Sequence, residues 1–260
     1  MLSRGPLVLA GTTFRDADVR QWLHAAHDQR QDSTHRVVAV MARQGLGLSR
    51  QQFADVREAV QQQWSAVGAD TLLVQDHADA AQILREVPAF GEADYQLPQA
   101  RARAFFDRQV DGFKQLQARY AVMLEGDLET LPDGRGRGSD LTLWLADGSD
   151  QLTRWASYDR TYRGPDKLRR VPLGHDSPWT AARAVSLNEV LVDTAATPTQ
   201  GPGRWQTVLA APVTVSLPGG PDLVLGAVSV GTTGVVEGDD ELPWRTVMAD
   251  LAESWSQRVV

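Results

Sequence analysis

The stretch 205–230, WQTVLAAPVTVSLPGGPDLVLGAVSV, decides the fold of the second half of this 260-residue chain. Residues 208–217 and 223–230 are dense in β-branched and aliphatic side chains, which is typical of strands. Between them, residues 218–222 combine glycine, proline and aspartate, the residues that tight turns use. The stretch therefore predicts a β-hairpin at the centre of an antiparallel sheet.

Segments on both sides of this hairpin extend the antiparallel pattern. Strands over 141–145 and 152–158 flank an Asp-Gly-Ser turn at 147–149, which predicts a second hairpin. Ser177 is a good N-cap for a helix with proline in its first turn. An amphipathic helix over 243–258 would close the sheet from the other side.

The central hairpin resembles a known family. A strand ending in Ala211-Pro212-Val213, a turn, and then LGAVSV at 225–230 resemble the central hairpin of GAF domains, small sensor modules that hold a ligand or a partner against an antiparallel sheet. The order of elements matches that family over about residues 100–260. The signature of members that bind cyclic nucleotides is absent, and so is the cysteine that thioether-linked tetrapyrroles need.

The resemblance implies a ligand site formed by the sheet and the segment 158–202. Aromatic side chains together with arginine suit a nucleobase carrying a phosphate, because a ring face stacks and a guanidinium binds an anion. Packing in the core is an equally good explanation for the tryptophans. The candidate ligand-binding residues are Trp155, Tyr158, Tyr162, Arg163, Arg170, His175, Asp176, Trp179, Arg183 and Trp205.

The first part of the chain alternates strand and helix patterns, which predicts a parallel sheet with right-handed crossovers. Short apolar runs predict three strands, and the periodic segments after them predict helices, the first capped by Asp16 or Asp18 and the last by Asp76. The predicted strands are 7–11, 35–41 and 71–74, and the later two helices are 49–67 and 78–87. Three strands make a small sheet.

Open parallel sheets bind ligands outside the carboxyl ends of their strands. The nucleotide-binding candidates at this edge are Gly11, Thr12, Thr13, Asp16 and Asp76. No G-x-G-x-x-G or Walker sequence accompanies them. We therefore favour turn and capping roles for these residues over contact with a nucleotide.

Residues 5–88 resemble the C-terminal half of the sirtuin-like, Rossmann-like domains of bacterial defence proteins. Gly11, Thr13 and Asp16 stand where that family has a Gly-x-Ser-x-x-Asp-type stretch, with threonine in place of serine. The family's N-terminal half, with its Gly-Ala-Gly loop and its catalytic histidine and asparagine, has no counterpart. The resemblance therefore implies a partial module that does not cleave NAD by itself.

A proline-bounded lapse in periodicity at 88–98 marks the predicted domain boundary. We predict a first module over 1–90, a linker over 91–98 and a second domain over 99–260. The second domain would begin with one long helix, 99–125, about 40 Å long at helical rise. Its apolar stripe fits either the domain's own core or a homodimer seam, and the length of the helix favours some contribution to a homodimer. The stripe consists of Phe105, Phe106, Val110, Phe113, Leu116, Tyr120 and Met123.

Composition excludes several classes of protein. The chain has no cysteine, so disulfides, thiolate zinc sites and cysteine nucleophiles are absent. No apolar run approaches the roughly 20 residues of a membrane helix, and we expect a cytoplasmic protein without a membrane partner. The net charge of −7 disfavours nucleic acid as a partner.

Local charges and histidines offer few further sites. The basic residues at 135 and 137, and at 167, 169 and 170, lie in glycine- or proline-marked loops, where solvated charge is a better explanation than an anion site. His24 and His27 share a helix but lack a third ligand nearby, so we predict no metal. No catalytic residue and no cofactor are predicted.

The sequence therefore favours a non-enzymatic sensor or regulatory protein. Its GAF-like module would bind a small molecule, for example a nucleotide, and its partial α/β module would transmit the signal or dock a partner. The resemblances imply a place in bacterial signalling or antiviral defence. Two alternatives stay open: an NAD- or nucleotide-processing effector subunit completed by a partner, and a structural adaptor without a ligand. A chain that opens almost directly on a strand is also compatible with a short product of a longer protein.

Overall fold

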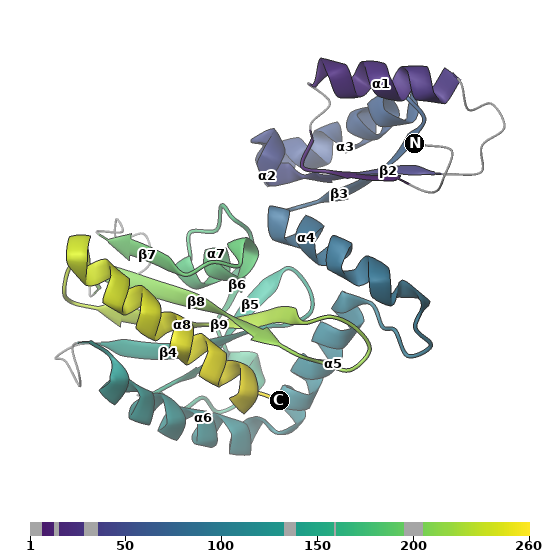
Figure 1. The fold of residues 1–260 in the computed structure, drawn as a ribbon. Coiled ribbons are helices and arrows are strands. Elements are labelled where there is room, and N and C mark those ends of the chain that lie inside the picture. Colours follow the sequence, from purple (N-terminus) through teal and green to yellow (C-terminus); the bar gives the residue numbers. More distant parts are fainter. Residues whose placement is uncertain (1–6, 13–15, 29–35, 133–138, 159, 195–204) are drawn as a thin grey trace. The chain divides into compact units, whose positions relative to one another are not determined.

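The computed structural model describes residues 7–12, 16–28, 36–132, 139–158, 160–194 and 205–260 (Figure 1). The chain divides into two compact units, Met1–Leu84 and Arg85–Val260. The first contains a three-stranded parallel sheet and the second a six-stranded antiparallel sheet flanked by helices, so the predicted fold class is confirmed. Among the described residues, no helix is long and apolar enough to cross a membrane.

The sheet of the first unit has the strand order β1-β2-β3, and both neighbouring pairs are parallel. Because the strands follow one another in space as they do in sequence, right-handed crossovers place their helices on the same face. Leu23, Phe53 and Trp64 accordingly share one buried core with that face. The elements are β1 (Leu7–Ala10), α1 (Ala17–Asp28), β2 (Val37–Ala42), α2 (Arg43–Leu46), α3 (Arg50–Ser65), β3 (Ala69–Val74) and α4 (His77–Glu86), the last of which reaches the start of the second unit.

Helix α3 begins where its sequence predicts. The Ser49 hydroxyl accepts a hydrogen bond from the backbone N–H of Gln52 at 3.2 Å, and the Gln52 side chain accepts one from the N–H of Ser49 at 2.9 Å. This reciprocal capping satisfies two N–H groups that the first helical turn leaves without partners. The short helix α2, in contrast, was not predicted, because four residues show no periodicity.

The second unit is built on a sheet with the strand order β6-β5-β4-β9-β8-β7, in which every neighbouring pair is antiparallel. The predicted central hairpin is confirmed as the pair β8–β9, and the second predicted hairpin as β4–β5. The strands are β4 (Asp140–Ala146), β5 (Gln151–Ser157), β6 (Arg170–Pro172), β7 (Leu191–Thr194), β8 (Thr207–Val215) and β9 (Leu223–Thr232).

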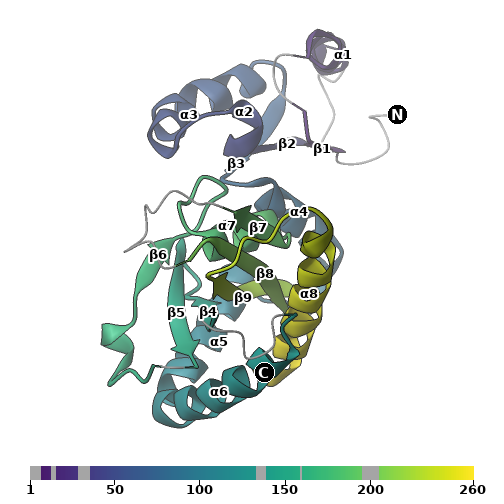
Figure 2. The same cartoon turned by 90° about the vertical axis from the view of Figure 1, so that its left-hand side faces the viewer.

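Helices cover the two faces of this sheet unequally (Figures 1 and 2). Three helices, α5 (Pro98–Asp111), α6 (Phe113–Asp127) and α8 (Glu241–Arg258), pack on the face that carries the leucines of β4. The opposite face carries Trp144 and Ala146 and packs against α7 (Thr180–Leu187). We call this second side the α7 face.

The prediction of one long helix over 99–125 is wrong, because the helix breaks at Gly112. This glycine, with φ −87° and ψ 8°, ends α5 and precedes α6. The break lets both helices turn their apolar residues toward one sheet, and Phe105, Phe113 and Tyr120 are each at most 5% exposed within a single chain. The stripe therefore belongs largely to the core of the second unit. The homodimer stays a prediction, and this stripe no longer supports it.

The start of α7 also differs from the prediction. The helix begins at Thr180, three residues after the expected N-cap. The hydroxyl of Ser177 instead donates a hydrogen bond to the carbonyl oxygen of Pro172 at 2.9 Å and so ties the loop to the end of β6. Ala182 and Val185 of α7 are buried in the core on the α7 face.

Candidate functional site

Two of the nucleotide-binding candidates of the first unit, Asp16 and Gly11, have local structural roles. Asp16 caps α1, because its Oδ1 accepts hydrogen bonds from the backbone N–H groups of Asp18 at 3.1 Å and Val19 at 3.2 Å. Gly11 has φ +75°, a conformation that favours glycine in a turn. Thr12 lies beside it, whereas Thr13 is outside the described residues.

Asp76 lies after β3, and β2 separates that strand from β1. Two strand spacings, roughly 10 Å, therefore lie between this residue and Gly11. Arg43 follows β2, the strand between β1 and β3, and is 1% exposed. It was not predicted from the sequence. Its Nε donates to Gln75 Oε1 at 3.0 Å and its Nη1 to the carbonyl oxygen of Leu48 at 2.9 Å. Arg43 thus binds loops of this edge together.

In the second unit, the structure distributes the predicted ligand-binding aromatics over both faces of the sheet. Trp155 is fully buried between α5 and α6, with its ring edge-on to Phe106 at 5.5 Å and Phe113 at 5.4 Å. Tyr158 and Tyr162 pack against the same core. Trp179 packs on the α7 face instead. One pocket cannot contain all of these rings.

The predicted polar residues lie mostly at the surface. Arg163, Arg170 and Asp176 are exposed, and His175 is half-buried. Arg183 is held on the α7 side by an ion pair with Asp193.

The basic loop over 167–170 is mostly solvated. Lys167 lies 2.9 Å from Asp166 at the surface, and this contact raises the pKa of Lys167 and lowers the pKa of Asp166. Arg169 lies over the ring of Trp179, 5.2 Å from the ring centre. The two arginines at 135 and 137 lie outside the described residues.

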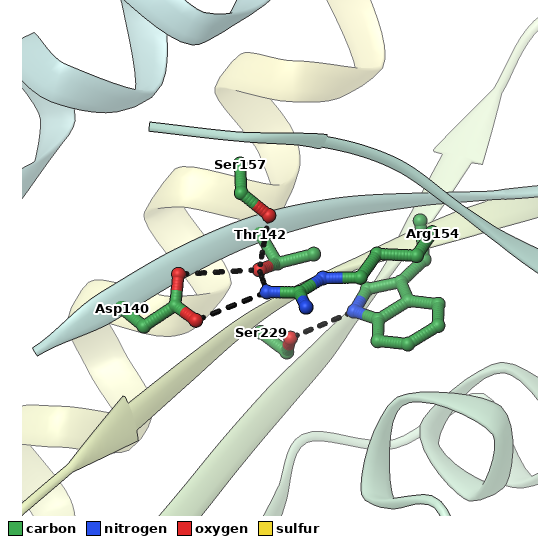
Figure 3. Close-up of polar contacts among 6 residues, drawn as sticks. Asp140, Thr142, Arg154, Ser157 and Ser229 are labelled. Atoms are coloured by element: carbon green, nitrogen blue, oxygen red, sulfur yellow. Dashed lines mark hydrogen bonds and ion pairs between the residues drawn. The ribbon is translucent and has the colours of Figure 1, made fainter. Parts of the chain in front are cut away.

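A different group of polar side chains lies together on the α7 face (Figure 3). Asp140 and Thr142 alternate along β4 with leucines that face the opposite core, and Thr142 is paired in register with Ser157 of β5 and Ser229 of β9. Arg154 of β5 reaches toward them. We call Asp140, Thr142, Arg154, Ser157 and Ser229 the α7-face polar cluster.

Hydrogen bonds connect most of this cluster. Arg154 Nη2 donates to Asp140 Oδ2 at 3.0 Å and to Thr142 Oγ1 at 3.1 Å. The hydroxyls of Thr142 and Ser157 are 3.0 Å apart, and Ser229 Oγ accepts a hydrogen bond from Trp144 Nε1 at 2.8 Å. The side chains of Arg154 and Asp140 are 14% and 10% exposed, so this ion pair is largely withdrawn from water.

One hydrogen-bond donor of the cluster has no acceptor among the described residues. Arg154 Nε is buried and has no hydrogen-bond partner among the described residues. A buried donor without a partner costs about 1–3 kcal/mol. Such a group is a candidate contact for a ligand or a water molecule.

Trp205 lies next to this cluster on the same face. Gly231 is paired with Asp140 in register and follows Ser229 by two residues, so its missing side chain would point toward the α7 face. The ring of Trp205 fills that place, because a Cβ built on Gly231 would lie 2.7 Å from the ring's Cδ2. Trp205 is half-buried. Of the predicted ligand-binding aromatics, it has the best placement for a site here.

A second ion pair lies in the row of cross-strand neighbours that contains Asp140 and Gly231. Asp193 is paired with Val208, which is paired with Gly231, so Asp193 and Asp140 stand at opposite ends of the row. Arg183 of α7 pairs with Asp193, and Thr180 Oγ1 donates to the same carboxylate at 2.5 Å. Each carboxylate in the row is therefore already balanced by an arginine.

The sequence contained one signal that could have found the cluster. Asp140 and Thr142 are polar positions that alternate with Leu141 and Leu143, and such alternation separates two faces of a strand. The prediction instead collected aromatic and charged residues from one segment without assigning them to faces. Strand register, which composition does not contain, decides which side chains meet.

The α7-face polar cluster can offer hydrogen bonds to a bound group. Within the described residues, no group of three or more histidine, aspartate and glutamate side chains could hold a metal ion. The cluster pairs its one carboxylate with its one guanidinium, an arrangement that offers hydrogen-bond donors.

Together, the two sheets and their helices define a mixed α/β protein whose second unit is an antiparallel sheet between helical layers. No family model matches the chain, and no curated protein matches it. Among solved structures, the chain is similar to the GAF domain of a phosphoenolpyruvate-protein phosphotransferase from Acinetobacter, at 14% sequence identity and a TM-score of 0.34, over 63% of this chain and 94% of that chain.

Two further structures show a comparable similarity. A methyl-accepting chemotaxis protein, residues 122 to 287, is 18% identical with a TM-score of 0.35, over 61% of this chain and 96% of that chain. The GAF domain of a phosphoenolpyruvate-protein phosphotransferase from Coxiella burnetii is 12% identical with a TM-score of 0.37, over 62% of this chain and 96% of that chain. The structural neighbours of the chain thus include GAF domains.

Proposed function

We propose that this protein is a non-enzymatic sensor or regulatory protein whose second unit binds a small molecule at the α7-face polar cluster. The observation that carries the proposal is the buried Arg154 Nε, which has no partner among the described residues. A ligand that accepts its hydrogen bond would recover the energy lost by burying it. Trp205 supplies an aromatic surface beside the cluster.

The first unit fits a transmitting or docking role better than a catalytic one. Asp16 uses its carboxylate to cap α1, and Arg43 uses its guanidinium to hold the loops after β2 and β3. Both groups lie at the edge where a parallel sheet binds ligands. Their existing contacts support a structural role for this edge, in agreement with the missing nucleotide fingerprint.

The test is a thermal shift of the purified full-length protein with cyclic nucleotides, NAD, ADP-ribose and purines. A ligand at 100 times its Kd stabilises a protein by about 2.7 kcal/mol, which raises Tm by roughly 5–10 °C at this chain length. We expect at least one compound to give such a shift. Arg154→Gln should abolish it, whereas the exposed Arg163→Gln should leave it intact.

The charge change at position 154 needs a control for folding, because it leaves Asp140 without its partner. The double variant Asp140→Asn, Arg154→Gln removes both charges and should fold even if the single variant does not. Absence of any shift with the whole panel would contradict the proposal. Consumption of NAD by the isolated chain would contradict its non-enzymatic part.

A further inference from the structure

We infer that the group recognised by the α7-face polar cluster is a neutral hydrogen-bond acceptor, such as the carbonyl oxygen of a planar heterocyclic amide, and not a carboxylate or phosphate. This inference rests on the proposed function and names its ligand class. Two properties of the cluster carry it: which hydrogen-bonding groups are unused, and how its charges balance.

The unused groups of the cluster are donors. Arg154 Nη2 is engaged twice, but Nε has no partner among the described residues. Ser229 Oγ accepts from Trp144 Nε1, and no described group accepts its hydroxyl hydrogen. Figure 3 shows both groups on the same side of the sheet. A ligand atom placed against them must therefore be an acceptor.

Charge balance selects a neutral acceptor. Asp140 compensates Arg154 through a direct ion pair that is largely withdrawn from water. Counted over the described residues of the cluster, a ligand anion would lose its hydration and add one negative charge to a pair that is already balanced. The other pair in the row, Arg183 with Asp193, is likewise balanced and offers no positive charge to offset the anion.

The neighbourhood also favours a planar molecule. Gly231 leaves room for the Trp205 ring close to the sheet, in the strand row that contains Asp140. An indole face is suited to stacking on a flat ring. A heterocycle carrying an amide carbonyl combines the flat ring and the neutral acceptor in one molecule.

The experiment compares neutral and anionic compounds of nearly equal shape. The pairs are nicotinamide with nicotinate, uracil with orotate, and adenosine with adenosine monophosphate, each titrated calorimetrically into the full-length protein. We expect the neutral member of at least one pair to bind at least about 10-fold more tightly, a preference of about 1.4 kcal/mol. Its Kd should change little with salt, because no net charge is involved.

A single substitution should reverse the preference. Asp140→Asn leaves the Arg154 charge uncompensated, so the anionic member of the same pair should now bind more tightly. The control is Arg163→Asn, which removes a charge at the surface and should keep the preference for the neutral member. Circular dichroism of each variant checks folding, and the salt dependence of the native protein tests the inference independently.

The outcomes separate this inference from the proposed function. Tighter binding of the anionic members by the native protein, lost in Arg154→Gln, would overturn the inference and leave the sensor function standing. Binding of neither member of any pair, together with no thermal shift in the wider panel, would overturn both. If a compound of the wider panel binds while no pair member does, the inference is overturned as well.

Discussion

At the scale of single residues, Tyr120 shows how one polar group can join three helices in a core. Its hydroxyl, on α6, donates to Gln109 Oε1 of α5 at 2.9 Å, and Gln109 Nε2 donates to the carbonyl oxygen of Val259 at 2.8 Å, just after α8. Its ring lies edge-on to Trp255 of α8 at 5.4 Å. Burial raises the pKa of Tyr120, because the phenolate would lack water.

The raised pKa of Tyr120 predicts a loss of stability in alkaline solution. The folded protein holds this proton more tightly than the unfolded chain does, so the contribution of Tyr120 is complete below the unfolded pKa of about 10. It is lost as the pH rises through the folded pKa. Tyr120→Phe should cost about 1–3 kcal/mol at neutral pH, because Gln109 Oε1 loses its donor.

Urea unfolding of the native protein and of Tyr120→Phe at a series of pH values measures this effect. The free-energy difference between the two proteins should shrink as the pH rises above about 10. Subtracting the two curves removes the titration of every other group. A difference that stays constant over the whole range would show that burial of Tyr120 does not perturb its ionisation.

Residue identity predicted part of this arrangement. Helical spacing placed Phe105, Phe113 and Tyr120 on one apolar stripe, and all three are buried. The partner of the Tyr120 hydroxyl was not predictable, because Gln109 comes close only when Gly112 breaks the helix. The face of Trp155 was not predictable either, since a register shift between β4 and β5 lies beside it.

At the scale of elements, β9 depends on a close approach to β4 at Gly226. A Cβ on this glycine would overlap the carbonyl oxygen of Trp144, a backbone atom that cannot move aside alone. Gly226 is paired with Leu145 on one side and with Val213 on the other, next to a register shift in β8. The central strand thus requires a residue without a side chain here.

We predict that Gly226→Ala destabilises the second unit by about 1–3 kcal/mol or more, because the added methyl group must separate β9 from β4. The control is Gly234→Ala, where the nearest atom to the added Cβ is Thr232 Oγ1 at 3.6 Å, an ordinary contact. The control should change stability by no more than about 1 kcal/mol. Urea unfolding followed by tryptophan fluorescence compares them. Equal stability of the two variants would rule out the close approach.

Single helices and hairpins were more predictable from the sequence than the pairing of strands that are distant in the chain. The β8–β9 hairpin followed from two aliphatic runs around a glycine-rich turn, and α3 lies within the helix predicted over 49–67. Pairing of β9 with β4 joins residues 81 to 91 positions apart in the chain, from Leu145 with Gly226 to Asp140 with Gly231. Such long-range pairing leaves no local trace, and it is what brings Ser229 beside Thr142 in the candidate site.

At the scale of the whole molecule, the segment before α5 belongs physically to the second unit. The side chain of Arg101 is 1% exposed, and its Nη2 donates to Glu86 Oε1 at 2.5 Å. Its Nε donates to the carbonyl oxygen of Gln96, and its Nη1 donates to the carbonyl oxygen of Pro221 in the β8–β9 turn. The backbone N–H of Gln96 also donates to the carbonyl oxygen of Gly219 at 2.8 Å. The predicted linker, 91–98, is thus hydrogen-bonded to the central hairpin.

This network predicts where the second unit can be separated from the first. A fragment over 85–260 keeps Glu86 and should unfold cooperatively, whereas a fragment over 99–260, which starts at the domain boundary predicted from sequence, leaves Arg101 buried without its carboxylate. Removing one partner of a buried ion pair costs about 3–5 kcal/mol, so the shorter fragment should be less stable by at least that amount. Urea unfolding of both fragments measures the difference. The variant Glu86→Gln in the full chain removes only the ion pair and should account for most of the lost stability. Equal stability of the two fragments would show that Arg101 does not depend on Glu86. The boundary predicted from sequence would then be the better one.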